Sequence, residues 1–301
     1  MRIIKYNNEK FIDAEQYAGS EFETWYNTTV SYLQNVIQDE SVKADMLMDN
    51  DKYLIQKTDG DTCIVLGHDK IYRKKKFPLS AVAFECPMVV TFLRENLLGI
   101  MPGIALRPGY DAHAFIHELL HALSSTTIHF FNENGISYIK IGTKVKYIDK
   151  NMEYVDGKNL SAEGFNEGIT EALASLITGR FTGQYPSHTA IGTLFVTSNS
   201  LALNAYFSHD LSRLEEFYKD LEEKQSIITR EDLMNFGKDT SEELIARIIA
   251  AGVAYNKAYN QDFDEQLYSL LIQNMDNADR LDNGSWRDLI AKYQTGIGSM
   301  S

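Results

Sequence analysis

The chain has 301 residues, of which 44% are hydrophobic, and its 42 acidic side chains outnumber its 29 basic ones to give a formal net charge of −13. This excess of negative charge argues against nucleic acid or an anionic membrane as the main partner, and the length suffices for one large domain or two subdomains that share an interface. The first residues lack the apolar core of a signal peptide, and no run approaches the about 18 apolar residues of a membrane span. We therefore expect a cytoplasmic protein, although export without a cleavable signal stays open. In that reducing compartment Cys63 and Cys86 are expected to be free thiols.

Residues 1–110 carry mixed helix and strand patterns. Ser20-Glu-Phe-Glu23 is a capping box, and the apolar residues after it recur at helical spacing, which predicts an amphipathic helix that reaches Ile37. Three strand patterns and then a short helical pattern follow: 62–66, 71–72 and 81–84 as strands, and 87–98 as a helix.

The most informative pattern in the chain is His117-Glu118-Leu119-Leu120-His121. Asp111 is a natural N-cap in front of it, and apolar residues at helical spacing run on to Leu123, which predicts a helix. Two histidines four residues apart on a helix can present two nitrogens to one Zn²⁺, and the glutamate beside them can then take a proton from a metal-bound water. The alternative is a buried helix whose histidines are satisfied by hydrogen bonds.

The residues directly after this pattern do not supply a third ligand. The metzincin pattern requires a glycine and a histidine where this chain has Ser124 and Thr127. His129 falls in an apolar run that predicts a strand, so we interpret it as a strand or rim histidine. His113, one turn before the pattern, is a poor candidate because three ligands from one straight helix cannot converge on a tetrahedral ion.

A second helical pattern supplies acidic candidates. It runs from Ser161 to a predicted C-terminal cap at Gly179, and Glu167 and Glu171 lie four residues apart on one face, beside its apolar stripe. Two carboxylates at this spacing repel each other on a bare helix, so they call for a compensating cation or histidine. We therefore expect Glu167 to be the third metal ligand, and Glu171 to interact with the metal ligands rather than with the metal itself.

A β-hairpin is predicted between the two ligand helices. Residues 136–141 and 144–148 alternate apolar and polar side chains, with Asn134-Gly135 before them and Gly142-Thr143 between them as turn residues. The hairpin could close one side of a cleft, or its free edge could pair with an extended substrate segment. A surface hairpin without contact to substrate fits the sequence equally well.

From residue 186 onward the patterns are helical. The predicted helices are 188–208, 210–224, a helix capped by Thr240-Ser-Glu-Glu243 that runs to about Tyr259, 263–275 and 285–294.

The motif His117-Glu118-x-x-His121 followed by Asn166-Glu167-Gly168-x-Thr170-Glu171 resembles the gluzincin metallopeptidases, the thermolysin-like clan, over about residues 111–180. The long interval between His121 and Glu167 is most similar to that in the family of anthrax lethal factor. The resemblance implies that His117, His121 and Glu167 bind zinc and that Glu171 orients His117. It also implies that Asn166 belongs to the surroundings of the metal.

The resemblance further implies hydrolysis of peptide bonds, with Glu118 as the general base. Gluzincins stabilise the oxyanion with a tyrosine or histidine, and in the lethal factor family this tyrosine precedes the ligand by seven residues. The present chain has Leu160 at that position, so the oxyanion donor is unassigned. The candidates are Tyr154, Tyr185, His188, Tyr206 and His209.

The implied fold is α+β and zincin-like, with a small mixed β-sheet over the active-site helix, a β-hairpin insertion and a mostly helical C-terminal half. We predict an N-terminal helical segment over 1–50, a catalytic subdomain with both ligand helices over 51–185, and a helical C-terminal subdomain over 186–301. The expected activity is that of a zinc metalloendopeptidase with one Zn²⁺ per chain and a peptide or protein substrate. The alternative is a catalytically silent zincin-like protein that keeps the metal site and binds or regulates a partner. The sequence does not indicate an oligomeric state.

Overall fold

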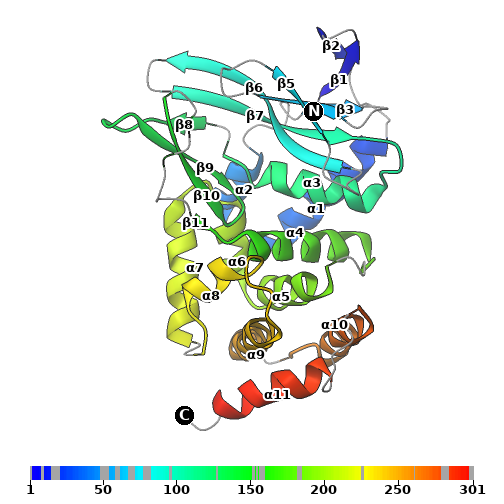
Figure 1. Ribbon diagram of the computed structural model, residues 1–301, viewed down its shortest axis with the longest axis vertical. Coiled ribbons are helices and arrows are strands. Elements are labelled where there is room, and N and C mark those ends of the chain that lie inside the picture. The colour runs from blue at the N-terminus through cyan, green and yellow to red at the C-terminus, as the bar shows by residue number, and fades with distance from the viewer. Residues whose placement is uncertain are drawn as a thin grey trace. The chain divides into compact units, whose positions relative to one another are not determined.

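The computed structural model of the chain contains both strands and helices (Figure 1). The structure describes residues 2–7, 10–14, 21–47, 54–57, 62–66, 72–76, 83–94, 97–126, 128–150, 153, 155, 160–181, 185–224, 227–260, 262–278 and 285–297. Its strands are β1 (Arg2–Asn7), β2 (Lys10–Ala14), β3 (Leu54–Lys57), β4 (Thr62–Leu66), β5 (Tyr72–Lys76), β6 (Ala83–Arg94), β7 (Leu97–Leu106), β8 (Ile128–Phe130), β9 (Ile136–Ile141), β10 (Lys144–Asp149) and β11 (Leu160–Ser161). Its helices are α1 (Glu21–Val36), α2 (Glu40–Leu47), α3 (Ala112–Leu123), α4 (Glu163–Thr178), α5 (Pro186–Val196), α6 (Ser200–Phe207), α7 (Leu211–Lys224), α8 (Arg230–Asn235), α9 (Glu242–Tyr259), α10 (Glu265–Ala278) and α11 (Trp286–Ile297).

The chain divides into two compact units, Met1–Leu160 and Ser161–Ser301. The first unit holds α1–α3 and nearly all of the strands, and the second is built from α4–α11. This separation of strands and helices along the chain confirms the predicted α+β class at the coarse level. The predicted boundaries at residues 50 and 185 stay predictions.

The main sheet of the first unit has the strand order β2-β1-β3-β7-β6, and β8 also pairs with β7. β1, β3 and β7 run parallel, whereas β2, β6 and β8 are antiparallel to the strands they pair with. α3 packs against β6 and β7, so the sheet supports the helix that carries the two histidines.

The prediction of a short helix over 87–98 is wrong, because these residues belong to β6 and the start of β7. The run Val89-Val90-Thr91 is β-branched, which favours the strand, and Val90 pairs with Ile100 of β7. Pro87 is tolerated because the β6–β7 register shifts between Pro87 and Val89. Strand pairing with a segment about ten residues away therefore overrides the local helical pattern.

Aromatic packing joins α1 to α3 in the core of the first unit. The Phe115 ring of α3 lies 5.0 Å from Phe22 and 5.5 Å from Trp25, measured between ring centroids. Phe22 and Phe115 are both fully buried, together with Leu119 and Leu120 of α3. The helix α1 confirms the predicted amphipathic helix after residue 20. Its aromatic side chains pack on the face of α3 that lies opposite to His117 and His121.

The predicted β-hairpin between the two ligand helices is confirmed as β9 and β10. The strands pair antiparallel from Lys144 opposite Ile141 to Asp149 opposite Ile136. Gly135 and Gly142 have positive φ angles of 69° and 59°, in the left-handed region that favours glycine. The glycines thus set the turns that the sequence indicated.

Buried aromatic side chains form the core of the second unit. The Phe165 ring of α4 stacks on Phe217 of α7 at 5.7 Å and meets Phe195 of α5 edge-on at 5.3 Å. α9 packs against α5, α8 and α11, and most of its residues are buried. In the part of the chain that the structure describes, no helix has the length and hydropathy needed to cross a lipid bilayer.

The prediction of a single helix over 188–208 is wrong, because the structure has two helices, α5 and α6. α5 ends at Val196, and Asn199 then adopts an extended conformation in which its side chain accepts a hydrogen bond of 2.8 Å from the Leu201 amide. An asparagine cap of this kind begins a new helix, and it outweighs the continuous apolar pattern on both sides. The predicted helices 210–224, 240–259, 263–275 and 285–294 are confirmed as α7, α9, α10 and α11 within a few residues.

Candidate metal centre

Helix α3 begins as the sequence predicts and presents His117 and His121 on one face. The carboxylate of Asp111 accepts a hydrogen bond of 2.9 Å from the Ala114 amide and caps the helix. The two imidazole ring centroids lie 5.0 Å apart, at an interplanar angle of 74°. His117 is half-buried and His121 is 7% exposed, so both rings are partly withdrawn from water. A helix of this geometry offers two nitrogens to one ion.

The C-terminal end of α3 is held by hydroxyl groups. Ser124 and Ser125 each donate a side-chain hydrogen bond to the carbonyl oxygen of His121, at 3.0 and 2.7 Å. These bonds satisfy a helix-terminal carbonyl that has no partner within the helix. The serine at position 124, which departs from the metzincin pattern, therefore has a structural role at the end of the histidine helix.

Helix α4 carries the acidic candidates. It ends at Gly179, whose left-handed φ of 66° confirms the predicted cap. Glu167 is half-buried and Glu171 is only 4% exposed. The two carboxylates lie on one face because four residues make slightly more than one helical turn.

Close contact between the backbones of α4 and α5 brings His188 to this acidic face. A Cβ atom on Gly192 would lie 1.9 Å from the Gly168 carbonyl oxygen, so neither helix could approach this closely with larger residues. Burial lowers the pKa of His188 below its ordinary value, and the nearby carboxylates of Glu167 and Glu171 oppose part of this effect. The imidazole of His188 thus lies within the electrostatic reach of both acidic side chains.

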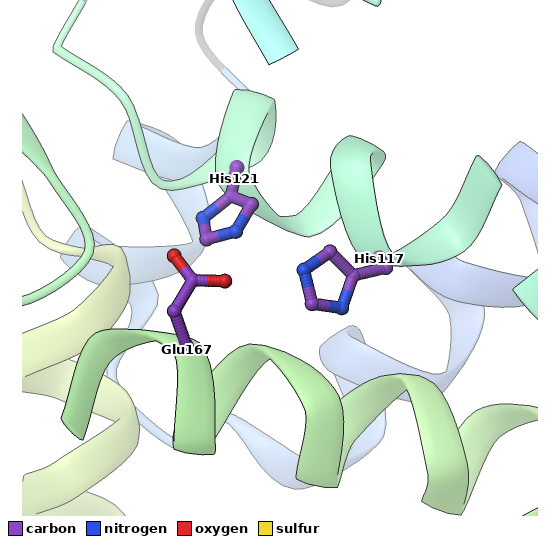
Figure 2. A group of neighbouring side chains, drawn as sticks. All are labelled: His117, His121 and Glu167. Carbon is purple, nitrogen blue, oxygen red and sulfur yellow. The ribbon is translucent and has the colours of Figure 1, made fainter. Parts of the chain in front are cut away.

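The ligand atoms of His117, His121 and Glu167 lie within 4.8 Å of one another. Figure 2 shows the carboxylate of Glu167 facing the two imidazole rings. Among the described residues, this is the one group of histidine, cysteine, aspartate and glutamate side chains that could hold a metal ion. Two imidazoles and one carboxylate are a donor set that zinc accepts, with bonds of about 2.0–2.2 Å.

Glu118 and Asn166 flank these three residues in sequence. Glu118 is half-buried on α3, beside His117. Asn166 is buried on α4, and its carbonyl oxygen accepts a hydrogen bond of 2.8 Å from the Thr170 hydroxyl. Neither residue belongs to the group that could hold the metal.

The structure places four of the five candidate oxyanion donors in different surroundings. Tyr206 is fully buried on α6, and its hydroxyl lies 2.7 Å from that of Thr170, so it links α6 to α4 within the core. Tyr185, the residue directly before α5 in the chain, is 52% exposed, and its ring centroid lies 5.7 Å from that of His188. His209 is half-buried between α6 and α7. Tyr154 lies outside the described residues.

The sequence did not reveal the glycine contact between α4 and α5 or the bond between Thr170 and Tyr206. The spacing of Gly164 and Gly168 on α4 is a signal for close packing, since both glycines lie on one face. A Cβ on Gly164 would lie 2.5 Å from the carbonyl oxygen of Phe236, and one on Gly168 would lie 2.7 Å from that of His188. Backbone atoms of other segments therefore pack directly against both glycines of α4. His129, interpreted as a strand or rim histidine, is a buried residue of β8 whose Nδ1 lies 2.7 Å from the Tyr138 carbonyl oxygen.

No protein-family model, curated protein or solved structure matches this chain.

Proposed function

We propose that this chain is a zinc metallopeptidase of the gluzincin type, with a zincin-like arrangement around its two ligand helices. The observation that carries the proposal is the grouping of His117, His121 and Glu167, with Glu118 adjacent to the first histidine on α3. The sequence motifs that resemble gluzincins contain the same four residues in the same roles.

The donor set supports a catalytic rather than a structural zinc site. Structural zinc sites are closed by four protein ligands, whereas catalytic sites have three and leave one position for water or substrate. His117, His121 and Glu167 provide three ligands, two imidazoles and one carboxylate, which is the number found in catalytic sites. Zinc held by His117, His121 and Glu167 would polarise a carbonyl group and would lower the pKa of a coordinated water to about 7.

The proposed roles of the neighbouring side chains follow from their chemistry. Glu118 takes a proton from the attacking water and passes it to the leaving amine. Glu171 orients the imidazole of His117 through its second ring nitrogen, as a carboxylate commonly does for a histidine ligand. Of the oxyanion candidates, His188 has the best support, because it lies within the electrostatic reach of Glu167, whereas the hydroxyl of Tyr206 is engaged by Thr170.

The metal site makes a direct prediction about zinc content. Purified wild-type protein should contain about one zinc ion per chain, and His121→Ala and Glu167→Ala should each lose most of it. Glu163→Gln is the matched control, since Glu163 is an exposed residue of α4 one turn before Glu167 and should leave the zinc content unchanged. Elemental analysis by mass spectrometry measures the metal. Equal zinc in all four proteins would rule out the site.

Peptide cleavage tests the proposed activity itself. The zinc-loaded protein is incubated with a peptide library made from a whole proteome, and new peptide termini are identified by mass spectrometry. Cleavage that depends on zinc and shares a sequence preference would support the peptidase. A protein that binds zinc through these ligands but leaves the library intact would instead be the catalytically silent binding or regulatory protein.

A further inference from the structure

Phe236 and His188 both pack against α4, at two glycines that are one helical turn apart. The Gly164 amide donates a hydrogen bond of 3.0 Å to the carbonyl oxygen of Phe236, and a Cβ atom on Gly164 would lie 2.5 Å from that oxygen. A Cβ atom on Gly168 would lie 2.7 Å from the carbonyl oxygen of His188. Two backbone segments therefore reach α4 at neighbouring turns, which side chains at these two positions would prevent.

The side chains of these two residues meet beside α4. The ring centroids of His188 and Phe236 lie 4.6 Å apart at an interplanar angle of 37°, and Phe236 is fully buried. Glu167 and Glu171 lie within electrostatic reach of His188, which places its imidazole near the acidic face of α4. The ring of Phe236 thus packs on an imidazole that lies close to a candidate metal ligand.

Helix α8 holds Phe236 in place. The Phe236 amide donates a hydrogen bond of 3.0 Å to the Asp232 carbonyl oxygen and ends this helix. The carboxylate of Asp232 accepts hydrogen bonds from the Thr229 amide and hydroxyl, at 2.8 and 3.1 Å, and also pairs with Arg247 of α9. One carboxylate therefore caps α8 and ties it to α9, so that Phe236 extends from a fixed support.

Ring packing, more than hydrogen bonding, determines the orientation of His188. The Ser187 hydroxyl lies 3.5 Å from His188 Nδ1, which is too long for a firm hydrogen bond. An apolar ring restricts the rotation of an imidazole and does not occupy either of its nitrogens. The imidazole held by Phe236 consequently keeps its capacity to donate a hydrogen bond to a ligand.

We propose that Phe236 is a positioning residue for His188: its ring holds the imidazole beside the acidic face of α4, where a ring N–H donates to the carbonyl oxygen of a bound peptide. This inference rests on the proposed peptidase function, in which His188 is the best supported oxyanion donor. A donor stabilises the developing negative charge most when it is already in position before the reaction begins. Phe236 supplies this order without contacting the substrate.

NMR of metal-free protein with labelled histidines observes the ring of His188 directly, and His188→Ala identifies its signals. Burial lowers the pKa of His188, so the ring is neutral at pH 8 and its signals report position rather than charge. We expect an ordered wild-type ring whose carbon-bound protons are shifted by the ring current of Phe236. Phe236→Leu should remove that shift and increase the motion of the imidazole on the ps–ns timescale.

A double-mutant cycle in the zinc-loaded protein tests whether Phe236 acts through His188. His188→Ala should lower kcat about 10²–10³-fold, as the loss of one oxyanion donor does. Phe236→Leu should lower kcat between about tenfold and 10²-fold, with KM within twofold of wild type, because a displaced donor weakens the transition state more than substrate binding. In the His188→Ala background, Phe236→Leu should cause no further loss of kcat.

Phe217→Leu is the matched control, because Phe217 is a fully buried phenylalanine of the same unit that stacks on Phe165. It should keep the His188 signals and should keep kcat within twofold of wild type. A mobile His188 ring in the wild type would overturn the proposal, even if Phe236→Leu does not fold. Unchanged His188 signals in Phe236→Leu, equal effects in Phe217→Leu, or additive losses in the cycle would also refute it. If the wild type cleaves no peptide, the peptidase fails, and the NMR measurement still decides whether Phe236 holds His188.

Discussion

Glu118→Gln should abolish peptide cleavage while the protein keeps its zinc. Glutamine has nearly the same shape as glutamate but cannot accept a proton from water, and general acid–base catalysis contributes about 10²–10⁴-fold to rate. Glu118 is outside the group of residues that could hold the metal, so zinc content should stay within twofold of wild type. The initial rate on one peptide from the library and the zinc content of the same sample measure the two effects.

The control for this experiment is again Glu163→Gln, which removes one carboxylate from an exposed position. It should keep both the cleavage rate and the zinc content, and so separate the role of Glu118 from a change in net charge. If Glu118→Gln cleaves the peptide as fast as wild type, Glu118 is not the general base. A loss of both zinc and cleavage would instead show that Glu118 maintains the metal site.

The two helices that carry the candidate metal ligands could be predicted because their signals are local. Asp111 caps α3 through the amide of Ala114, three residues away, and Gly179 ends α4 in a left-handed conformation. Helical spacing alone places His117 above His121, and their ring centroids are 5.0 Å apart in the structure. Each of these features depends on residues within about two helical turns, which a sequence displays directly.

The errors arose where distant residues decide the structure. The strand after Pro87 is held by pairing with β7, and no local pattern identifies that partner. The break at Asn199 depends on one side-chain hydrogen bond within an otherwise continuous apolar pattern. Burial does not alternate along the hairpin as the pattern of apolar and polar residues suggests. Both faces of the hairpin contribute buried residues, and Lys140 is one of them. The alternation of apolar and polar residues does not show which face of the hairpin is covered by the rest of the chain.

Gly192→Ala should strongly destabilise the second unit, although alanine is the better helix former. Helix propensity alone predicts a gain of about 1 kcal/mol. The added Cβ would however lie 1.9 Å from the Gly168 carbonyl oxygen and 2.8 Å from the Ile169 amide nitrogen, and backbone atoms cannot rotate away. Separating α4 from α5 should cost about 3 kcal/mol or more, at the upper end of overpacking effects. Chemical denaturation of metal-free protein measures this loss.

Gly252→Ala is the matched control, since Gly252 also lies inside a helix of the second unit. Its added Cβ would meet the Leu194 side chain at 3.2 Å, and a side chain can shift by a few tenths of an ångström. We expect this variant to lie within about 1 kcal/mol of wild type, because the gain in helix propensity offsets a mild contact. Equal stability of the two variants would mean that the α4–α5 backbone contact does not hold these helices together. A large loss in Gly192→Ala alone would show that the backbone contact between α4 and α5 stabilises the second unit.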